Sequence, residues 1–232
     1  MNFFFRIAFS ALALLVGGGC SLLASKSEPY AIYSPQLTVP TETSDAAPVA
    51  WQLVVDTPTA SDALDTTRIV VMAAPGVLQV YPAARWSDPA PRLLRNLMIQ
   101  SFQQTGRIAG VGDSGSGLRA DYALATDLHE FQIDFSKGAP QAVIRLNAKL
   151  LDYAVNRVVT AQSFDATVPA GGTDGSAAAT ALQAALNDAL PKITQWVLQE
   201  AEKNFVASKR TAAKGDSTRS DPTSRMPPTT ER

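Results

Sequence analysis

The chain has 232 residues, with 20 Lys or Arg against 21 Asp or Glu, so its formal net charge at pH 7 is −1. This balance argues against the basic surface of a nucleic-acid-binding protein. One cysteine excludes an internal disulfide, and one histidine leaves few ligands for a transition metal. We therefore expect no nucleic-acid partner and no metal site.

Residues 1–19 have the layout of a signal peptide for export. One basic residue, Arg6, precedes an apolar stretch over residues 7–16, and small residues follow. The stretch is shorter than the ~20 residues that a transmembrane helix needs, which favours removal of this segment. Retention as a membrane anchor remains the alternative, because three phenylalanines at positions 3–5 lengthen the apolar end.

Cys20 directly follows the small residues of this leader. A lone cysteine in an exported chain is either a free thiol or a modified one, and we favour modification. Its position resembles the lipidation signal of bacterial lipoproteins, in which the thiol receives a diacylglyceryl group and becomes residue one of the mature chain. Acyl chains contribute ~0.8 kcal/mol per buried methylene, so a multiply acylated Cys20 would stay on a membrane. Ser21, in place of Asp, resembles the class sorted to the outer membrane.

After a short polar spacer over residues 20–29, the chain predicts β-strands. Three short runs rich in β-branched residues, at 51–56, 68–73 and 77–81, are bounded by Pro or Gly. A Pro-Gly pair between the last two runs predicts a tight turn, and therefore a hairpin.

Ser87, Asp88 and Pro89 predict the start of a helix, with Asp or Ser as its cap and proline in its first turn. Gly106 predicts its end. Between them, large apolar residues recur on one helix face, which we expect to pack on a sheet: Leu93, Leu94, Leu97, Met98 and Phe102.

The next runs predict longer strands. Residues 142–150 alternate between apolar and polar side chains, as a half-buried strand does. Over residues 121–135 the apolar set changes faces near His129 and Glu130, which a β-bulge would produce. A second hairpin then leads to a strand over residues 158–168.

A long alanine-rich helix is predicted to begin just after Asp174, and Pro191 predicts a kink or an interruption in it. Residues 207–232 have almost no large apolar side chain and are predicted to be disordered. The sum is an α+β fold: a mixed or antiparallel sheet with two main helices packed on one face, in a single domain over residues 30–206.

Fragments that look catalytic lack the context that their chemistry needs. Residues 110–115 have GxGxxG spacing, but a strand, not a helix, is predicted to follow. Ser114 lies in a Gly-Asp-Ser-Gly fragment, but His129 follows it in the chain, whereas in chymotrypsin-like proteases the histidine precedes the serine. His129 and Glu130 point to opposite faces of a strand, so they cannot share a metal. We expect no catalytic, cofactor-binding or metal-binding residues, and no enzyme.

The order of several features resembles one family. They are Cys20, the strand Tyr30-Ala31-Ile32, the helix start Trp86-Ser-Asp-Pro, the run Asp121-Tyr122-x-Leu124 leading to Phe131, and a last helix closing on Trp196. Together, over about residues 20–206, they resemble the ABC-type transport auxiliary lipoproteins, the PqiC-like group.

The resemblance implies a lipid-anchored periplasmic adaptor on the outer membrane of a Gram-negative bacterium. Its implied partners are an MCE-domain protein and the inner-membrane ABC transporter of that protein, which move phospholipid or other hydrophobic molecules between the two membranes and so support membrane integrity. A homo-oligomer is compatible with this role. Two alternatives stay open: a periplasmic lipid- or ligand-binding module that acts without a transporter, and a hydrolase with an unrecognised carboxylate site.

Overall fold

The computed structural model describes residues 29–38 and 47–219. The leader, Cys20, and residues 220–232 of the tail lie outside the described residues. The chain divides into two compact units, Met1–Tyr30 and Ala31–Arg232. All helices and strands named below belong to the second unit, and none of the helices in the described part is long and apolar enough to cross a membrane.

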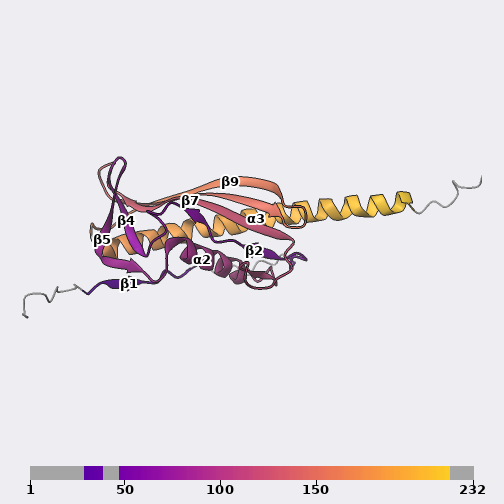
Figure 1. Ribbon diagram of the computed structural model, residues 1–232, viewed down its shortest axis with the longest axis horizontal. Helices are drawn as coiled ribbons and strands as arrows, with labels where there is room; N and C mark the ends of the chain where they lie inside the picture. Colours follow the sequence, from indigo (N-terminus) through magenta and orange to yellow (C-terminus); the bar gives the residue numbers. More distant parts are fainter. Residues whose placement is uncertain (1–28, 39–46, 220–232) are drawn as a thin grey trace, which may run out of the picture. The chain divides into compact units, whose positions relative to one another are not determined.

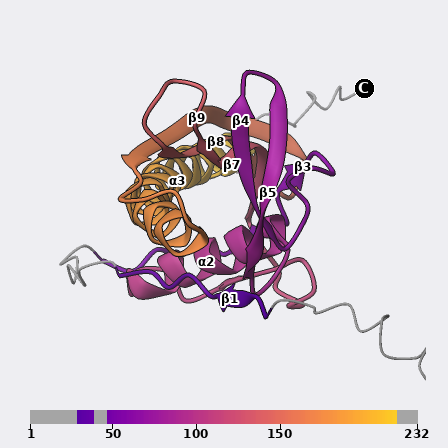
Figure 2. The ribbon, with the colours of Figure 1, turned by 90° about the vertical axis from the view of Figure 1, so that its left-hand side faces the viewer.

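The described residues form one mixed sheet of nine strands and two helices. The sheet curves around α2 (Ala90–Gln104) and α3 (Gly175–Arg219), which both lie on its inner face (Figures 1 and 2). This confirms the expected α+β fold. The strands are β1 Ala31–Tyr33, β2 Leu53–Val55, β3 Thr59–Ala60, β4 Arg68–Ala74, β5 Val77–Trp86, β6 Val111–Gly112, β7 Tyr122–Asp134, β8 Gln141–Asp152 and β9 Arg157–Pro169.

The long strand β7 connects the other strands. One of its edges pairs antiparallel with β8 along its whole length. Its other edge takes three shorter strands in turn, all parallel: β2 along residues 122–124, β3 along 127–128 and β4 along 132–134. The sheet continues from β4 through β5 to β1, from β8 to β9, and from β2 to β6. Parallel and antiparallel pairs therefore meet on a single strand.

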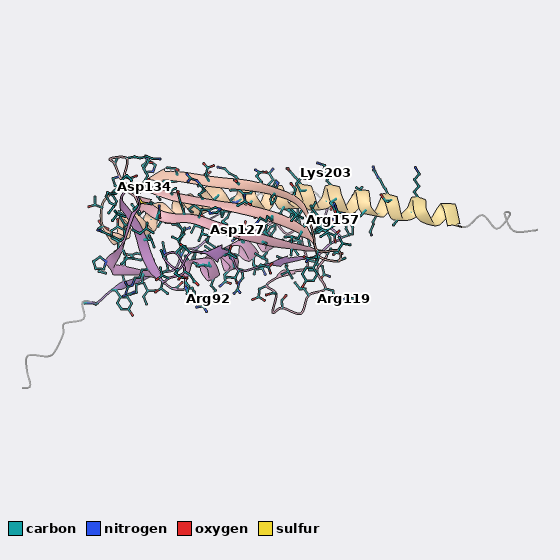
Figure 3. All side chains as sticks on the ribbon, turned by 45° about the horizontal axis from the view of Figure 1, so that its top comes forward. Arg92, Arg119, Asp127, Asp134, Arg157 and Lys203 are labelled. Atoms are coloured by element: carbon teal, nitrogen blue, oxygen red, sulfur yellow. The ribbon has the colours of Figure 1, made fainter. Side chains whose placement is uncertain are left out.

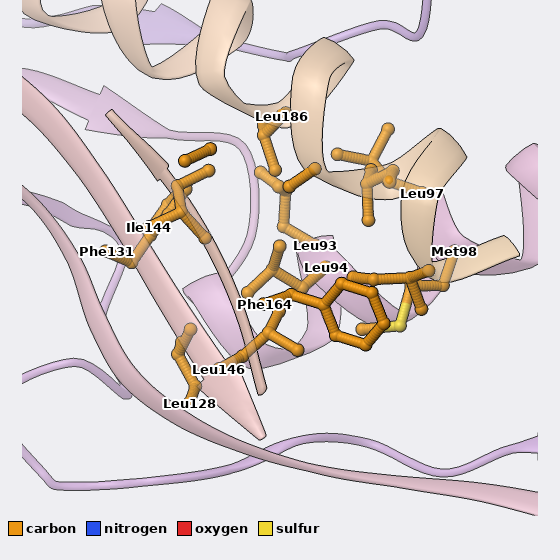
Figure 4. Close-up of a cluster of buried hydrophobic side chains, with 14 of the residues drawn as sticks. Leu93, Leu94, Leu97, Met98, Leu128, Phe131, Ile144, Leu146, Phe164 and Leu186 are labelled. Atoms are coloured by element: carbon orange, nitrogen blue, oxygen red, sulfur yellow. The ribbon is translucent and has the colours of Figure 1, made fainter. Parts of the chain in front are cut away.

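The predicted β-bulge lies in β7 at His129. Leu128 is paired with Leu146, and Glu130 is paired with the next residue of β8, Arg145. His129 is therefore an extra residue in β7 that has no partner in β8. Because side chains alternate along a strand, this extra residue reverses which positions face inward. The large apolar side chains before and after the bulge are all buried in the core, several of which are drawn in Figure 4.

Both predicted hairpins are confirmed. β4 and β5 pair antiparallel, with Gly76 in their turn at a φ of 77°, a left-handed conformation that glycine adopts at little steric cost. β8 and β9 also pair antiparallel, and Asn156 in their turn has a φ of 49°. Asparagine tolerates this region better than most residues, which suits it to the turn.

The helix α2 buries all five apolar residues of its predicted face. Gly106, with a φ of 64°, follows the helix end as expected. The predicted cap is wrong: Pro89 is the N-cap, and no side chain caps the helix. The Asp88 carboxylate is instead 2.6 Å from the Arg92 guanidinium, one turn further along. The carboxylate is thus held by a cation and not by backbone N–H groups.

The helix α3 begins as predicted, because Asp174 Oδ1 accepts hydrogen bonds from the backbone N–H groups of Ser176 and Ala177 at 2.8 and 2.9 Å. Pro191 lies inside a continuous helix, so the predicted interruption is absent. Its neighbours Leu190 and Ile193 are fully buried. Packing on both sides of the proline therefore outweighs its cost of ~3 kcal/mol in a helix interior.

The same helix continues through residues 207–219, which we expected to be disordered. These residues, where their side chains are described, are exposed. They extend a helix that is already nucleated by its packed part, which removes the main barrier to a short helical segment. Alanine, lysine and arginine are also good helix formers, and the Lys209 ammonium lies 4.7 Å from the centre of the Phe205 ring.

Two sets of polar contacts hold the helices in place. Between the helices, the hydroxyls of Ser101 and Thr194 share a buried hydrogen bond of 2.7 Å. Near the N-terminal end of β7, Trp51 Nε1 donates to Glu202 Oε2 at 2.9 Å and Tyr122 Oη donates to Asn204 Oδ1 at 2.8 Å. The Trp51 and Tyr122 rings also meet edge to face at 5.5 Å. Residues 202–204 of α3 are therefore tied to β7 and to the segment just before β2.

We predict that the bulge at His129 is required for folding. Deleting His129 would turn the apolar side chains of half of β7 toward solvent, so cooperative thermal unfolding, measured by circular dichroism, should be lost. The matched control is His129→Ala, which keeps the residue count. Because His129 is exposed, this substitution should change the free energy of unfolding by no more than ~0.5 kcal/mol. A deletion variant with native stability would contradict the proposed role of the bulge.

We also predict that Tyr122 ionises at an unusually high pH. Burial, followed by the charges of Asp152, Asp121 and Glu202, raises the pKa of Tyr122 to about 12. The folded chain favours the neutral phenol of Tyr122, which stabilises the fold. This stabilisation is complete below ~10, the pKa of tyrosine in the unfolded chain, and is lost as the pH rises toward the pKa of Tyr122 in the folded chain. In an absorbance titration, Tyr122→Phe should remove the last tyrosinate transition. Tyr153→Phe, at an exposed position, should leave that transition in place.

Candidate docking surfaces

The fragments that resemble catalytic motifs have structural roles. After residues 110–115 the chain enters the strand β7 and not a helix, so it cannot cradle a pyrophosphate as a dinucleotide loop does. Within this loop, Asp113 Oδ1 accepts a hydrogen bond from the Gly115 N–H at 3.1 Å, which makes a tight turn. Among the described residues, no cluster of three or more His, Cys, Asp or Glu could hold a metal ion.

Asp127, which the sequence places near His129, is bound by other groups. Its Oδ2 lies 2.7 Å from Lys149 Nζ, and its Oδ1 accepts a hydrogen bond of 2.5 Å from Thr59 Oγ1. These hydrogen bonds lower the pKa of the Asp127 carboxyl, and the bond from Lys149 has the largest effect. The charge of His129 lowers this pKa least. Asp127 therefore belongs to a cross-strand polar pair near the middle of the sheet (Figure 3).

A second cross-strand ion pair supports this view of the sheet surface. Arg145 Nη1 on β8 lies 2.7 Å from Glu130 Oε1 on β7, and the Arg145 side chain is about half exposed. Asn147 Nδ2 on β8 donates to Ser163 Oγ on β9 at 3.2 Å. Such pairs are typical of a solvated sheet face. The residues near the bulge thus contribute cross-strand contacts to the sheet.

Cys20, the one predicted site residue, lies outside the described residues. Its acylation therefore stays a prediction, as does removal of residues 1–19.

The strand β9 offers a binding edge that the sequence analysis did not identify. In the described part of the chain it pairs with β8 alone, so its other edge has backbone donors and acceptors with no partner strand. Natural edge strands are commonly protected by charged residues or proline. Along β9 the charged residues are only Arg157 and Asp165, and its proline, Pro169, is at the very end. This edge is suited to the addition of a strand.

Two open grooves run beside this edge, between β9 and α3. The first has a volume of about 470 Å³, and Phe164 and Trp196 meet there edge to face with ring centres 5.6 Å apart. Lys192 and three glutamines, Gln162, Gln195 and Gln199, surround the two rings. The second groove, of about 400 Å³, lies where β9 ends and α3 begins, and Asp174 and Thr180 are among its lining residues.

Exposed apolar residues gather at two hairpin ends. One end is the β4–β5 hairpin and the other is the β8–β9 hairpin. These two ends are far apart. β4 pairs with the C-terminal end of β7, whereas the β8–β9 turn follows Asp152, which pairs with Tyr122 at the N-terminal end of β7. Figure 3 shows Asp134 and Arg157 marking these opposite ends. The exposed residues are Val77, Leu78 and Val80 on the first hairpin, and Tyr153, Val155 and Val158 on the second.

Comparison with known proteins identifies relatives of the domain. The family model described as ABC-type transport auxiliary lipoprotein component matches residues 30–194. A crystal structure of a Xanthomonas campestris protein, assigned to the DUF330 family, is 36% identical with a TM-score of 0.70, and the match covers 75% of this chain and 98% of that one.

A second solved structure, of an uncharacterized protein, is 15% identical with a TM-score of 0.58. The match covers 73% of this chain and 99% of that one, and at this identity it shows a shared fold alone. No curated protein is similar enough to this chain to match.

We predict that Trp196 reports on the first groove. Of the three tryptophans, Trp51 and Trp86 are 1% and 2% exposed, whereas Trp196 is half-buried at the groove surface. Iodide should therefore quench Trp196 fluorescence and leave the other two nearly unchanged. Trp196→Phe should abolish the quenchable component. If the quenchable component persists in that variant, one of the two core tryptophans must be accessible, and the packing described above would be wrong.

Proposed function

This chain belongs to the family of ABC-type transport auxiliary lipoprotein components, and we propose that it is a lipid-anchored periplasmic adaptor of an MCE-containing transport system. In this role acylated Cys20 holds the chain on the periplasmic face of the outer membrane. The folded domain binds an MCE-domain protein, whose inner-membrane ABC transporter moves phospholipid or other hydrophobic molecules between the two membranes. The chain itself performs no catalysis.

The observation that carries this proposal is the extent of the family match. Residues 30–194 include every strand of the described sheet, all of α2 and the first part of α3. The related Xanthomonas structure is covered over 98% of its own length. The relation therefore concerns the whole domain and not a shared leader or one motif.

The edge of β9 supports a role in protein binding. An extended segment of a partner can add to this edge through backbone hydrogen bonds, which give affinity with little dependence on sequence. Its side chains would then reach the groove beside Trp196, where Lys192 and the glutamines supply polar contacts. An aromatic side chain set in a polar rim is a common centre of binding energy at protein interfaces.

The packing of the domain favours an adaptor over a lipid-binding module that acts alone. A module of that kind needs an apolar pocket large enough for acyl chains. In the described part of the chain, buried apolar side chains pack between the sheet and the helices, and Leu94, Phe102, Ile144 and Leu182 are at most 1% exposed. The grooves beside β9 are open and lined in part by charged or amide side chains. Such surfaces suit a peptide better than an acyl chain.

Site-specific photo-crosslinking in intact cells tests the proposed docking edge. A photoreactive residue at Gln199, exposed in the first groove, should capture the MCE-domain protein. The same residue at Asn96, exposed on α2, is the matched control and should capture much less. Adding Ala161→Glu places a charge on the exposed edge of β9, opposite Lys149 of β8, and should reduce capture at Gln199 without lowering the unfolding midpoint. Capture of a second copy alone would indicate a homo-oligomer edge instead.

Mass spectrometry of the N-terminus tests the anchor separately. The membrane-extracted chain should begin at Cys20 and carry acyl groups on it. An unmodified thiol on a chain that fractionates away from membranes would contradict the anchoring, whatever the crosslinking shows.

A further inference from the structure

The β4–β5 hairpin is unusually poor in charge. Residues 69–84 contain no Asp, Glu, Lys or Arg, in a chain in which 18% of residues are charged. Within this run the exposed fractions are 47% for Val77, 43% for Leu78 and 36% for Val80. These residues, with the polar but uncharged Gln79, form the surface that we call the hairpin tip.

Both faces of the hairpin tip are in solvent. Consecutive residues of a strand point to opposite faces, and residues 77–80 are all exposed. The tip therefore extends past the packed body of the sheet, and Figure 2 shows the β4–β5 turn rising beyond it. Along its other edge β5 pairs with β1 only over residues 84–86, so in the described chain residues 77–80 have β4 as their one partner strand.

The direction of β1 relates this tip to the N-terminal part of the chain. β1 runs parallel to β5, with Ala31 beside Ala84, so the backbone reaches Ala31 from the side on which the hairpin turn lies. From Ala84 back to Val77, the strand extends at most ~23 Å, because β5 is irregular between Val80 and Arg85. The segment from Cys20 to Ala31 can span up to ~36 to 40 Å. The chain between Cys20 and Ala31 is thus long enough for Cys20 and the hairpin tip to contact the same flat surface.

We propose that the hairpin tip inserts into the membrane that holds acylated Cys20, so that the domain has a second contact with the same lipid surface. This inference rests on the lipid anchor of the proposed function. Insertion removes the exposed Val77, Leu78 and Val80 from water. It dehydrates no charged side chain, and the backbone groups that β4 and β5 turn toward each other are already hydrogen-bonded, so only the backbone groups on the outer edges of the tip lose water.

A lipid surface fits this tip better than a protein does. The tip has no charged residue to set the register or choice of a protein partner. The acyl anchor also holds the tip close to lipid, which makes its insertion an intramolecular event with a high effective concentration. The β8–β9 hairpin, with Val155 60% exposed, has a similar apolar end but lies at the far end of β7, and we place it away from the membrane.

The test uses the full acylated chain with Leu78→Cys as its one free thiol, labelled with a nitrobenzoxadiazole fluorophore. The matched control is Val155→Cys, with the same label. Each protein is reconstituted into vesicles of phosphatidylethanolamine and phosphatidylglycerol, with or without doxyl-labelled lipid. We expect doxyl lipid to quench the label at position 78 while iodide loses access to it. At position 155 we expect the reverse.

Flotation with the vesicles separates failure of the anchor from failure of this inference. A chain that does not float has no lipid anchor, and the proposed function fails. If the chain floats but iodide quenches position 78 as strongly as position 155, the anchor stands and the hairpin inference is overturned. If position 78 is shielded from both quenchers, protein covers the tip, for example a second copy, and the lipid proposal is equally overturned.

Discussion

The pairing of β7 on both edges is the constraint on which the rest of this structure depends. One edge is occupied by β8 over its full length, and the other is shared among three short parallel strands. A strand with this many partners must present apolar side chains to the core along its whole length. The bulge at His129 makes this possible, because the strand changes face once while its pairing with β8 continues.

Once β7 and β8 are paired, the positions of the helices follow from their apolar faces. α2 brings a face of leucines, a methionine and a phenylalanine, whereas half of the buried apolar residues of α3 are alanines, so α3 can lie close to the strands. The buried hydroxyl pair of Ser101 and Thr194 joins the two helices. Because an unpaired buried hydroxyl costs ~1–3 kcal/mol, this bond favours one relative placement of the helices over others.

The same arrangement distributes the surfaces that are left for binding. β9 is the last strand on one side, so its edge and the grooves beside α3 stay available to a partner. The β4–β5 hairpin extends from the C-terminal end of β7, next to the strand through which the N-terminal segment joins the domain. The proposed surface for a protein and the proposed surface for lipid therefore lie on separate elements of the domain.

Much of this could be read from the sequence, because local patterns determine local structure. The apolar face of α2, the glycine turns, the bulge near His129 and the start of α3 at Asp174 each depend on neighbours within a few residues, and the structure confirms them. The capping of α2 was misjudged because Asp88 binds Arg92. The interruption at Pro191 does not occur because buried packing outweighs the local cost.

Only the tertiary structure decided what lies at an edge. Which strand ends the sheet, and which hairpin extends past the core, depends on pairings between residues far apart in the chain, and no local pattern contains them. The charge-free run of residues 69–84 was visible in the sequence, but it reads equally well as a buried hairpin. The sequence by itself thus determined the longer strands, the starts of both helices, the leader pattern and the family resemblance. The fold decided which of their faces remain in water, because burial is a property of the assembled sheet and helices.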